Sequence, residues 1–316
     1  MDGKCALNNR TLRLSASERT LFSKRIARVS SPLSPDETSG RIFQEDLLRV
    51  LDFFPDAFAD LMILDPPYNL DKNFNGFQFA RKSDSAYADY LESWFPRLMR
   101  LLKPDASVYL CGDWQSSAAL YGIMKKHLTV RSRITWQREK GRGAKSNWKN
   151  GLEDIWFGTV GKSYYFNVGA VKMRRRVIAP YKKDGRPKDW EQTSDGAFRL
   201  THPSNFWDDI SIPYWSMPEN TDHPTQKPEK LMAKLILASC PEGGMVFDPF
   251  AGSGTSCVAA KKLGRRFCGV ELNKEYVCWA LKRLALAETN PSIQGYHDGV
   301  FWERNTLTMQ SRKSSG

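Results

Sequence analysis

Apolar runs and amphipathic segments alternate along most of the chain, and their lengths predict the main strands and helices. Residues 59–64 are apolar except for one aspartate and end at two prolines, a pattern typical of a buried parallel strand. Residues 84–103 carry apolar side chains at helical spacing, and Pro104 ends this pattern before a strand over 107–111. The segments 133–136 and 154–158 indicate two further strands.

The alternation is clearest toward the C-terminal end. There we predict a helix over 228–239, a strand over 245–248, a helix over 256–263, a strand over 266–271 and a helix over 274–288. Because strands alternate with helices, the sequence predicts an α/β fold built on a doubly wound, mostly parallel sheet.

Three stretches lack this alternation. Residues 1–38 are polar and rich in serine, residues 168–215 are rich in Arg, Lys, Pro, Trp and Tyr, and residues 291–316 show no clear pattern. We therefore predict five parts, namely a polar N-terminal extension (1–38), a first α/β half (39–167), an inserted region (168–215), a second α/β half (216–290) and a C-terminal tail (291–316).

The charge balance adds a partner to this picture. The 316 residues carry a formal net charge of +12, and a nucleic acid is the simplest polyanion that such a chain would bind. No apolar run approaches the ~20 residues that a membrane span needs. The first 14 residues lack the apolar stretch of a signal peptide and the six cysteines form no CxxC pair, so we expect a cytoplasmic protein. With only four histidines, we expect no metal site.

A glycine-containing turn follows the predicted strand over 245–248. Its residues are Asp248, Pro249, Phe250, Ala251, Gly252, Ser253, Gly254 and Thr255. Glycines here let the backbone approach a ligand closely, but the third glycine of a dinucleotide fingerprint and the Gly-Lys-Ser/Thr of a phosphate loop are both missing. Glu271 ends the next strand 23 residues after Asp248, where it can accept hydrogen bonds from ribose hydroxyls. The turn therefore predicts a nucleoside-containing cofactor, and its acids suit a cationic one.

A second strand end carries Asp65, Pro66, Pro67 and Tyr68, followed by Asn69. Two prolines make the loop rigid and remove two amide donors, so its carbonyls must find partners outside the loop. These carbonyls and the Asp65 carboxylate can accept hydrogen bonds from an exocyclic amino group. The Tyr68 ring can stack on a base that has left its helix. We interpret this loop as a catalytic site that works by positioning, with neither a metal nor a covalent intermediate.

The two motifs together resemble those of the β-class amino methyltransferases of restriction-modification systems. In that family the Asp-Pro-Pro-Tyr motif precedes the cofactor motif, as Asp65 precedes Asp248 here by 183 residues. The resemblance implies a Rossmann-like methyltransferase fold with permuted motif order, S-adenosyl-L-methionine as cofactor and catalysis by Asp65, Pro66, Pro67 and Tyr68. It adds Asp46, in a segment where Glu45 replaces the usual glycine, and the stretch His223-Pro224-Thr225-Gln226-Lys227-Pro228. The cofactor-binding residues it implies are Asp46, His223, Thr225, Gln226, Lys227, Asp248, Phe250, Ala251, Gly252, Ser253, Gly254, Thr255 and Glu271.

The resemblance also implies a substrate. Asp65 at the first motif position is typical of enzymes that methylate N6 of adenine in double-stranded DNA, whereas serine there is typical of N4-cytosine enzymes. Residues 168–215 occupy the place of the target-recognition region, and we expect the basic runs 172–176 and 182–183 to contact phosphates. The basic loop 138–149 is a second candidate for a DNA contact. A homodimer is common in this family.

Four alternatives stay open at this point. They are N4-cytosine methylation, amino methylation of structured RNA, a DNA-binding relative that has lost catalysis, and an oxidoreductase that binds a nicotinamide cofactor. The missing third glycine disfavours the last of these.

Overall fold

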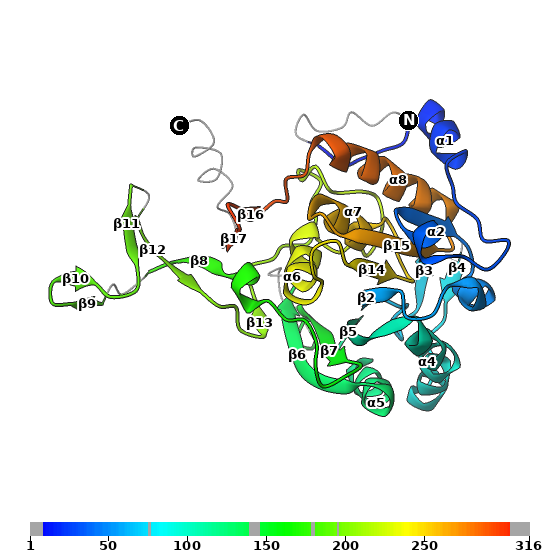
Figure 1. Ribbon diagram of the computed structural model, residues 1–316, viewed down its shortest axis with the longest axis horizontal. Helices are drawn as coiled ribbons and strands as arrows, with labels where there is room; N and C mark the ends of the chain where they lie inside the picture. The colour runs from blue at the N-terminus through cyan, green and yellow to red at the C-terminus, as the bar shows by residue number, and fades with distance from the viewer. Residues whose placement is uncertain (1–8, 75–76, 139–145, 178–180, 195, 304–316) are drawn as a thin grey trace.

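The computed structural model describes residues 9–74, 77–138, 146–177, 181–194 and 196–303. An eight-stranded sheet forms the centre, in the order β1-β15-β14-β2-β5-β7-β6-β13 (Figure 1). These strands are β1 (Arg41–Gln44), β15 (Arg266–Glu271), β14 (Met245–Asp248), β2 (Ala59–Leu64), β5 (Leu102–Gly112), β7 (Leu152–Thr159), β6 (Thr129–Gln137) and β13 (Phe206–Trp207). The strands from β1 to β5 in this order are parallel, and β7 is antiparallel to both of its neighbours. The predicted doubly wound, mostly parallel sheet is confirmed.

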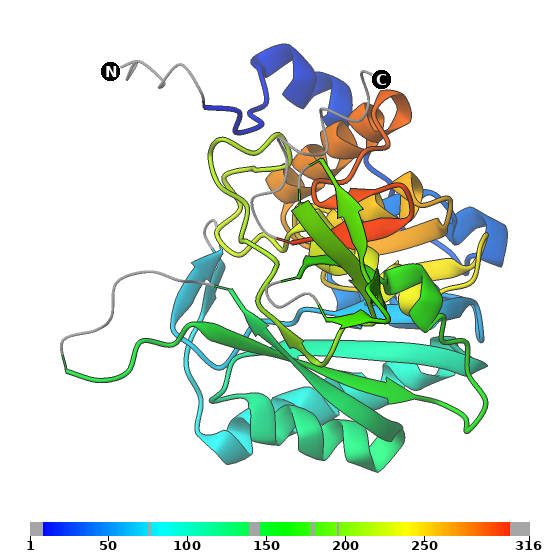
Figure 2. The same ribbon diagram turned by 90° about the vertical axis from the view of Figure 1, so that its left-hand side faces the viewer.

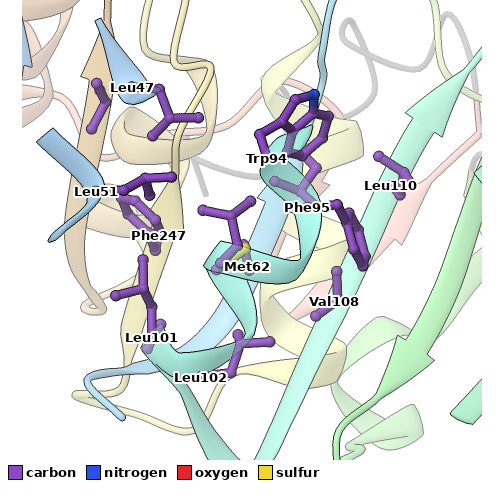
Figure 3. Packing of buried hydrophobic residues seen from close by; sticks show 14 of the residues in the cluster. Leu47, Leu51, Met62, Trp94, Phe95, Leu101, Leu102, Val108, Leu110 and Phe247 are labelled. Carbon is purple, nitrogen blue, oxygen red and sulfur yellow. The ribbon is translucent and has the colours of Figure 1, made fainter. Parts of the chain in front are cut away.

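Helices cover both faces of this sheet. One face carries α3 (Leu47–Val50), η1 (Leu51–Phe53), α4 (Asp84–Leu98), η2 (Met99–Leu101) and α5 (Ser117–His127). The other face carries α6 (Glu229–Ser239), α7 (Thr255–Lys262) and α8 (Lys274–Thr289). Figure 3 shows the first of these interfaces, where Trp94 and Phe95 of α4 lie against Met62 of β2 and Val108 of β5. Side chains alternate along a strand, and those of β2 pack into the cores on both faces of the sheet. The continuous apolar sequence of β2 predicts this burial on both sides.

One predicted break lies inside a strand. We expected Pro104 to end the helix over 84–103, but α4 ends at Leu98 and β5 begins at Leu102. Proline can enter β5 because the pairing with β2 is irregular here, jumping from Ala59 opposite Leu102 to Leu61 opposite Ser107. The missing amide of proline therefore leaves no gap in a regular ladder.

The described part of the N-terminal segment packs against the α/β body. Helix α1 (Ala16–Ser23) begins at Ser15 with a capping box to Glu18, and α2 (Pro35–Thr38) begins at Ser34 in the same way. Phe22 of α1 is buried beside Trp279 of α8. Residues 1–8 lie outside the described ranges, and the predicted boundary at 38 stays a prediction.

The inserted region contains short strands that its sequence pattern does not reveal. A second sheet has the order β11-β12-β8-β17-β16, and a separate hairpin pairs β9 with β10. These strands are β8 (Met173–Arg176), β9 (Lys182–Lys183), β10 (Arg186–Pro187), β11 (Glu191–Thr193), β12 (Gly196–Thr201), β16 (Tyr296–His297) and β17 (Val300–Trp302). In Figure 1 the strands from β8 to β12 project away from the body as an arm, which Figure 2 views from its tip. Two strands come from the segment we predicted as a patternless tail, since β17 pairs parallel with β8.

The remaining elements are η3 (Val168–Val171) and the hairpin of β3 (Lys72–Phe74) and β4 (Phe77–Phe79). Within the described ranges, no helix combines the length and the apolar character that crossing a membrane requires.

Candidate active site

A cavity of about 750 Å³ opens where the parallel strands end. It brings together the loop after β2, the loop after β14, the end of β15 and the segment before α6, which are far apart in the sequence. The residues predicted for catalysis and cofactor binding that line it are Asp46, Asp65, Pro66, Pro67, Tyr68, His223, Thr225, Gln226, Lys227, Asp248, Phe250, Ala251, Gly252, Ser253, Thr255 and Glu271. Of the predicted residues, only Gly254 is not part of the lining.

Hydrogen bonds to Tyr87 and Lys82 fix the loop after β2 to the protein. The hydroxyl of Tyr87, on α4, donates to the Pro67 carbonyl at 3.1 Å, and the amide side chain of Asn69 bonds the backbone of Lys82. The carbonyl of Pro67 is therefore engaged inside the protein. For an amino group entering the cavity, this leaves the Asp65 carboxylate and the Pro66 carbonyl as the acceptors of the loop.

Asp65 lies in a compact charged cluster. The ammonium nitrogen of Lys227 is 2.8 and 2.7 Å from the two Asp65 carboxylate oxygens and 3.0 Å from the Tyr68 hydroxyl. The same nitrogen lies 2.8 Å from Oε1 of Glu153. Tyr68 donates to Asp65 at 2.7 Å and is also within hydrogen-bond distance of Glu153. We predicted Lys227 as a cofactor ligand, whereas in the structure its charge lies among the residues predicted for catalysis.

Burial and charge together set the protonation of this cluster. Burial by itself would lower the pKa of Lys227, but the carboxylates of Asp65 and Glu153 outweigh it and raise that pKa above its usual range. Burial raises the pKa of Tyr68, and the same two carboxylates raise it further. Lys227 is therefore a cation and Tyr68 a neutral phenol at neutral pH.

Sequence reasoning missed Glu153. It is the second residue of β7, which runs antiparallel to its neighbours. A position near the start of this strand therefore lies at the edge where the parallel strands end. The available signal was an acidic pair, Glu153 and Asp154, at the start of an otherwise apolar strand. Both side chains are buried, which ionisable groups rarely are unless they have partners.

The loop after β14 forms a tight acidic turn. The Asp248 carboxylate accepts the Phe250 amide at 3.0 Å and the Ser256 hydroxyl, which fixes the turn onto the start of α7. Burial raises the pKa of Asp248 to about 7, despite these two donors. A cationic ligand close to this turn would stabilise the charged form of Asp248.

Glu271 lies across the turn from Asp248. Its carboxylate accepts the amides of Gly252 at 2.9 Å and Asn273 at 2.7 Å, so its orientation is fixed toward the cavity. Gly252 has a φ of +52° and is packed against His223, whose Nε2 would lie 2.9 Å from an added Cβ. Only glycine fits this conformation and this close approach.

Gly254 serves packing instead of lining the cavity. Its φ is +77°, and an added Cβ would lie 2.6 Å from Cβ of Ala280 on α8. The glycine therefore lets α7 begin against α8, which the sequence did not indicate. Arg283 of α8 braces the same loop, since it donates to the Ser253 carbonyl and the Thr255 hydroxyl, both at 2.9 Å.

The N-terminus of α6 has a partner within the protein, because the Glu229 amide donates to the side chain of Glu219 at 2.7 Å. Gln226 fixes the segment before α6, because its side chain accepts from the Thr221 amide and hydroxyl and donates to the Glu219 carbonyl. Burial lowers the pKa of His223 to about 3, so its imidazole is neutral.

These features fit a nucleoside cofactor that carries a positive charge. The cavity has the volume of a small-molecule site. Its wall presents Asp46, Asp248 and Glu271 on the cofactor side, together with a turn that no side chain larger than hydrogen could form at Gly252. The amino group to be modified would meet Asp65 at the other end.

Comparison with known proteins agrees with this interpretation. A family model described as "DNA methylase", for N6 and N4 methyltransferases, matches residues 59–282. The chain is 34% identical over 254 residues to "DNA adenine methyltransferase YhdJ" of Escherichia coli, covering 78% of this chain and 83% of that protein. It is 30% identical over 247 residues to "Type II methyltransferase M.HpaI" of Haemophilus parainfluenzae, covering 77% and 74%.

Solved structures share the fold. The "PvuII DNA methyltransferase (cytosine-N4-specific)" has a TM-score of 0.59 at 18% identity, over 78% of this chain and 86% of that one. The "M1.HpyAVI-SAM complex" has a TM-score of 0.51 at 23% identity, over 77% and 98%.

Proposed function

The chain belongs to the N6/N4 family of DNA methylases, and we propose that it transfers a methyl group from S-adenosylmethionine to N6 of adenine in double-stranded DNA. The observation that carries this proposal is the cavity that joins the Asp65 loop to the acidic turn after β14. A methyl donor on the turn and an amine on the loop would meet there. The family match also argues against a nicotinamide-dependent oxidoreductase.

The residues of the chain position the amine. Bound S-adenosylmethionine supplies an electrophilic methyl group. The Asp65 carboxylate and the Pro66 carbonyl accept the two amine hydrogens, which turns the nitrogen lone pair toward the cofactor side of the cavity. The carboxylate can accept this extra bond because its two oxygens offer about four acceptor sites. Tyr68 presents a ring face to the base, and positioning supplies most of the rate.

Adenine is proposed over cytosine on two grounds. Asp65 stands at the motif position that is typical of N6-adenine enzymes, and a relative at 34% identity is named an adenine methyltransferase. The fold alone does not decide, because a structural neighbour is named a cytosine-N4 enzyme. Mass spectrometry of nucleosides from DNA methylated by the purified protein distinguishes the two bases. Detection of N4-methylcytosine would overturn the adenine assignment. If no methylated base is detected, the chain is instead a DNA-binding relative that has lost catalysis.

Asp65→Ala tests the assigned roles. We expect the variant to lose methyl transfer while S-adenosylmethionine still binds, because the cofactor turn lies on other strands. Calorimetry measures the binding and radiolabelled methyl incorporation measures the transfer. Loss of both together would contradict a role limited to the amine.

We propose that the projecting arm contacts DNA. The hairpin of β9 and β10 exposes Lys182, Lys183 and Lys188 and adds Arg186. The expectation for the run 172–176 changes in part, because the guanidinium of Arg174 is stacked between the rings of Phe198 and Trp302 at 4.7 and 4.8 Å. Arg174 therefore stabilises the arm, and we assign the phosphate contacts to the hairpin of β9 and β10. The basic residues at 140, 142 and 145 lie outside the described residues.

The proposal has three further parts, namely a restriction-modification setting, a homodimer and a cytoplasmic location. The first two rest on the family resemblance, and the third rests on the scattered cysteines. A relative named a type II methyltransferase supports the first. Sedimentation of the purified protein tests the second, and a monomer at micromolar concentration would contradict it.

A further inference from the structure

Glu153 lies outside every motif but contacts the catalytic loop. Its side chain is 3% exposed, belongs to β7 and lines the cavity beside the loop after β2. One carboxylate oxygen meets Lys227 and Tyr68, and the other lies 3.5 Å from the guanidinium of Arg138. A buried acid with this set of contacts requires a reason beyond packing.

The phenol of Tyr68 stands between two carboxylates. Its oxygen lies 2.7 Å from Oδ1 of Asp65 and within hydrogen-bond distance of Oε1 of Glu153. A phenol has one hydrogen, which can serve only one of these contacts at a time. The other contact becomes a hydrogen bond when a carboxylate carries a proton. The phenol of Tyr68 and the carboxylates of Asp65 and Glu153 can therefore share one proton more than a neutral phenol and two ionised carboxylates carry.

We propose that Glu153 is the final acceptor of the proton that the target amine releases, reached through Asp65 and Tyr68. This inference rests on the proposed methyl transfer. The amine lone pair forms the new N–C bond while the C–S bond breaks and leaves its electron pair on sulfur. The nitrogen then holds one proton too many, and this proton passes to Asp65. Asp65 gives a proton to the Tyr68 oxygen as Tyr68 gives its own to Glu153, so the phenol is restored and Glu153 becomes neutral.

The neighbouring groups of the cluster cannot take this proton. Lys227 and Tyr68 already carry theirs, because the pKa of each is raised. Asp248 accepts the Phe250 amide and the Ser256 hydroxyl of the cofactor turn, which places it outside the path that runs from Asp65 through Tyr68.

The other titratable groups around the cluster come from four elements. Arg138 after β6 is a cation, and burial lowers the pKa of Lys72 of β3. The thiol of Cys111 on β5 keeps its proton because burial raises its pKa. His223, before α6, accepts the Thr225 amide at Nδ1, and burial lowers its pKa to about 3. Asp65 and Glu153 remain as the acceptors, and the charges of Lys227 and Arg138 stabilise Glu153 between turnovers.

Glu153→Gln tests the proposal, because glutamine keeps the shape and the acceptor oxygen but cannot take up a proton. In a single turnover with cofactor and DNA already bound, we expect the rate of methyl transfer to fall by about 10²-fold. The acid limb of the pH–rate profile should also lose one of its protonation steps. Infrared titration of the ligand-free protein gives an independent readout, since the variant should lack one protonated-carboxylic-acid band that appears in the wild type as the pH falls.

Asp154→Asn is the matched control. Asp154 follows Glu153 on β7 and points to the other side of the strand, where it accepts the hydroxyls of Ser117 at 2.8 Å and Thr135 at 3.1 Å. It is a buried carboxylate of the same strand that does not touch Tyr68. We expect its variant to keep the wild-type shape of the pH–rate profile.

A wild-type rate and pH profile in Glu153→Gln would overturn the proposal. If that variant does not fold, Tyr68→Phe removes the hydroxyl that relays the proton and must lose the same protonation step. A wild-type pH–rate profile in Tyr68→Phe would also overturn the proposal. If the wild type does not methylate DNA, the proposed function fails, and the infrared titration still reports whether Glu153 shares the proton.

Discussion

Lys227 holds together the two acids of the site, and its charge can be removed with little change of volume by Lys227→Met. In the wild type its nitrogen lies within 2.8 Å of both Asp65 and Glu153. The variant leaves two carboxylates and a phenol in contact without their shared cation. We expect a less stable protein whose stability depends on pH in a way that the wild type's does not.

The size of the loss follows from burial. The side chains of Lys227 and Glu153 are 7% and 3% exposed, and that of Asp65 is 20% exposed. Removing one partner of a buried ion pair costs about 3–5 kcal/mol. Because Asp65 reaches solvent, we expect the lower part of that range, about 3–4 kcal/mol. At roughly 2 °C per kcal/mol for a chain of this length, the melting temperature should fall by about 6–8 °C.

The pH dependence has a definite sign. The pKa of Lys227 is raised in the folded protein, so its contribution is complete below the unfolded value of about 10.4 and is lost only as the pH rises through the folded value. The wild-type contribution is therefore constant near neutral pH. In the variant, proton uptake by one carboxylate at low pH relieves the repulsion. The deficit should accordingly shrink as the pH falls.

Thermal unfolding followed by circular dichroism at several pH values measures both effects. Lys126→Met is the control, because Lys126 pairs with Glu92 at 3.2 Å and the two side chains are 65% and 40% exposed. Such a pair contributes about 0–1 kcal/mol. A Lys227→Met protein that melts within about 2 °C of the wild type at every pH would refute the reasoning.

Three further predictions concern the cofactor turn and the arm. Glu271→Ala should raise the dissociation constant of S-adenosylmethionine about 10- to 100-fold by calorimetry, because the variant lacks the charged carboxylate that accepts hydrogen bonds from the ribose hydroxyls; an unchanged constant would contradict its ribose contact. Gly254→Ala should cost about 2–3 kcal/mol in denaturant unfolding, since a strained φ adds to the contact with Ala280, whereas Gly264→Ala, with open space around it, should cost about 1 kcal/mol. Equal losses would remove the packing argument. Neutralising Lys182, Lys183, Arg186 and Lys188 together should flatten the salt dependence of DNA affinity by about 0.9 in log–log slope for each phosphate that the hairpin no longer neutralises. A wild-type slope would place the DNA elsewhere.

The sequence predicted the elements that have a regular pattern. The strand over 59–64 is buried on both faces, so every position but one is apolar, and its bounds match β2. The strands of the inserted region and of the C-terminal tail could not be predicted, because they are two to six residues long and too short to show a periodic pattern. The parallel pairing of β17 with β8 joins segments more than 100 residues apart, which no local pattern can reveal.

The site divides in a similar way. The loops of Asp65 and Asp248 were predicted because each follows a recognisable strand and carries a distinctive turn. Glu153 was not predicted as a site residue, because β7 runs antiparallel and its N-terminal end, not its C-terminal end, faces the cavity. Lys227 was assigned to the cofactor from its neighbours in the sequence, whereas its partner is set by a contact across 162 positions.

A crystal structure with S-adenosylmethionine bound tests the central claim most directly. The two loops must present donor and acceptor to one another across a shared space. We predict that the methyl carbon lies within about 4 Å of the space beside the Asp65 carboxylate and the Pro66 carbonyl, with the ribose at Glu271. A cofactor whose sulfonium points away from Asp65 would contradict the account.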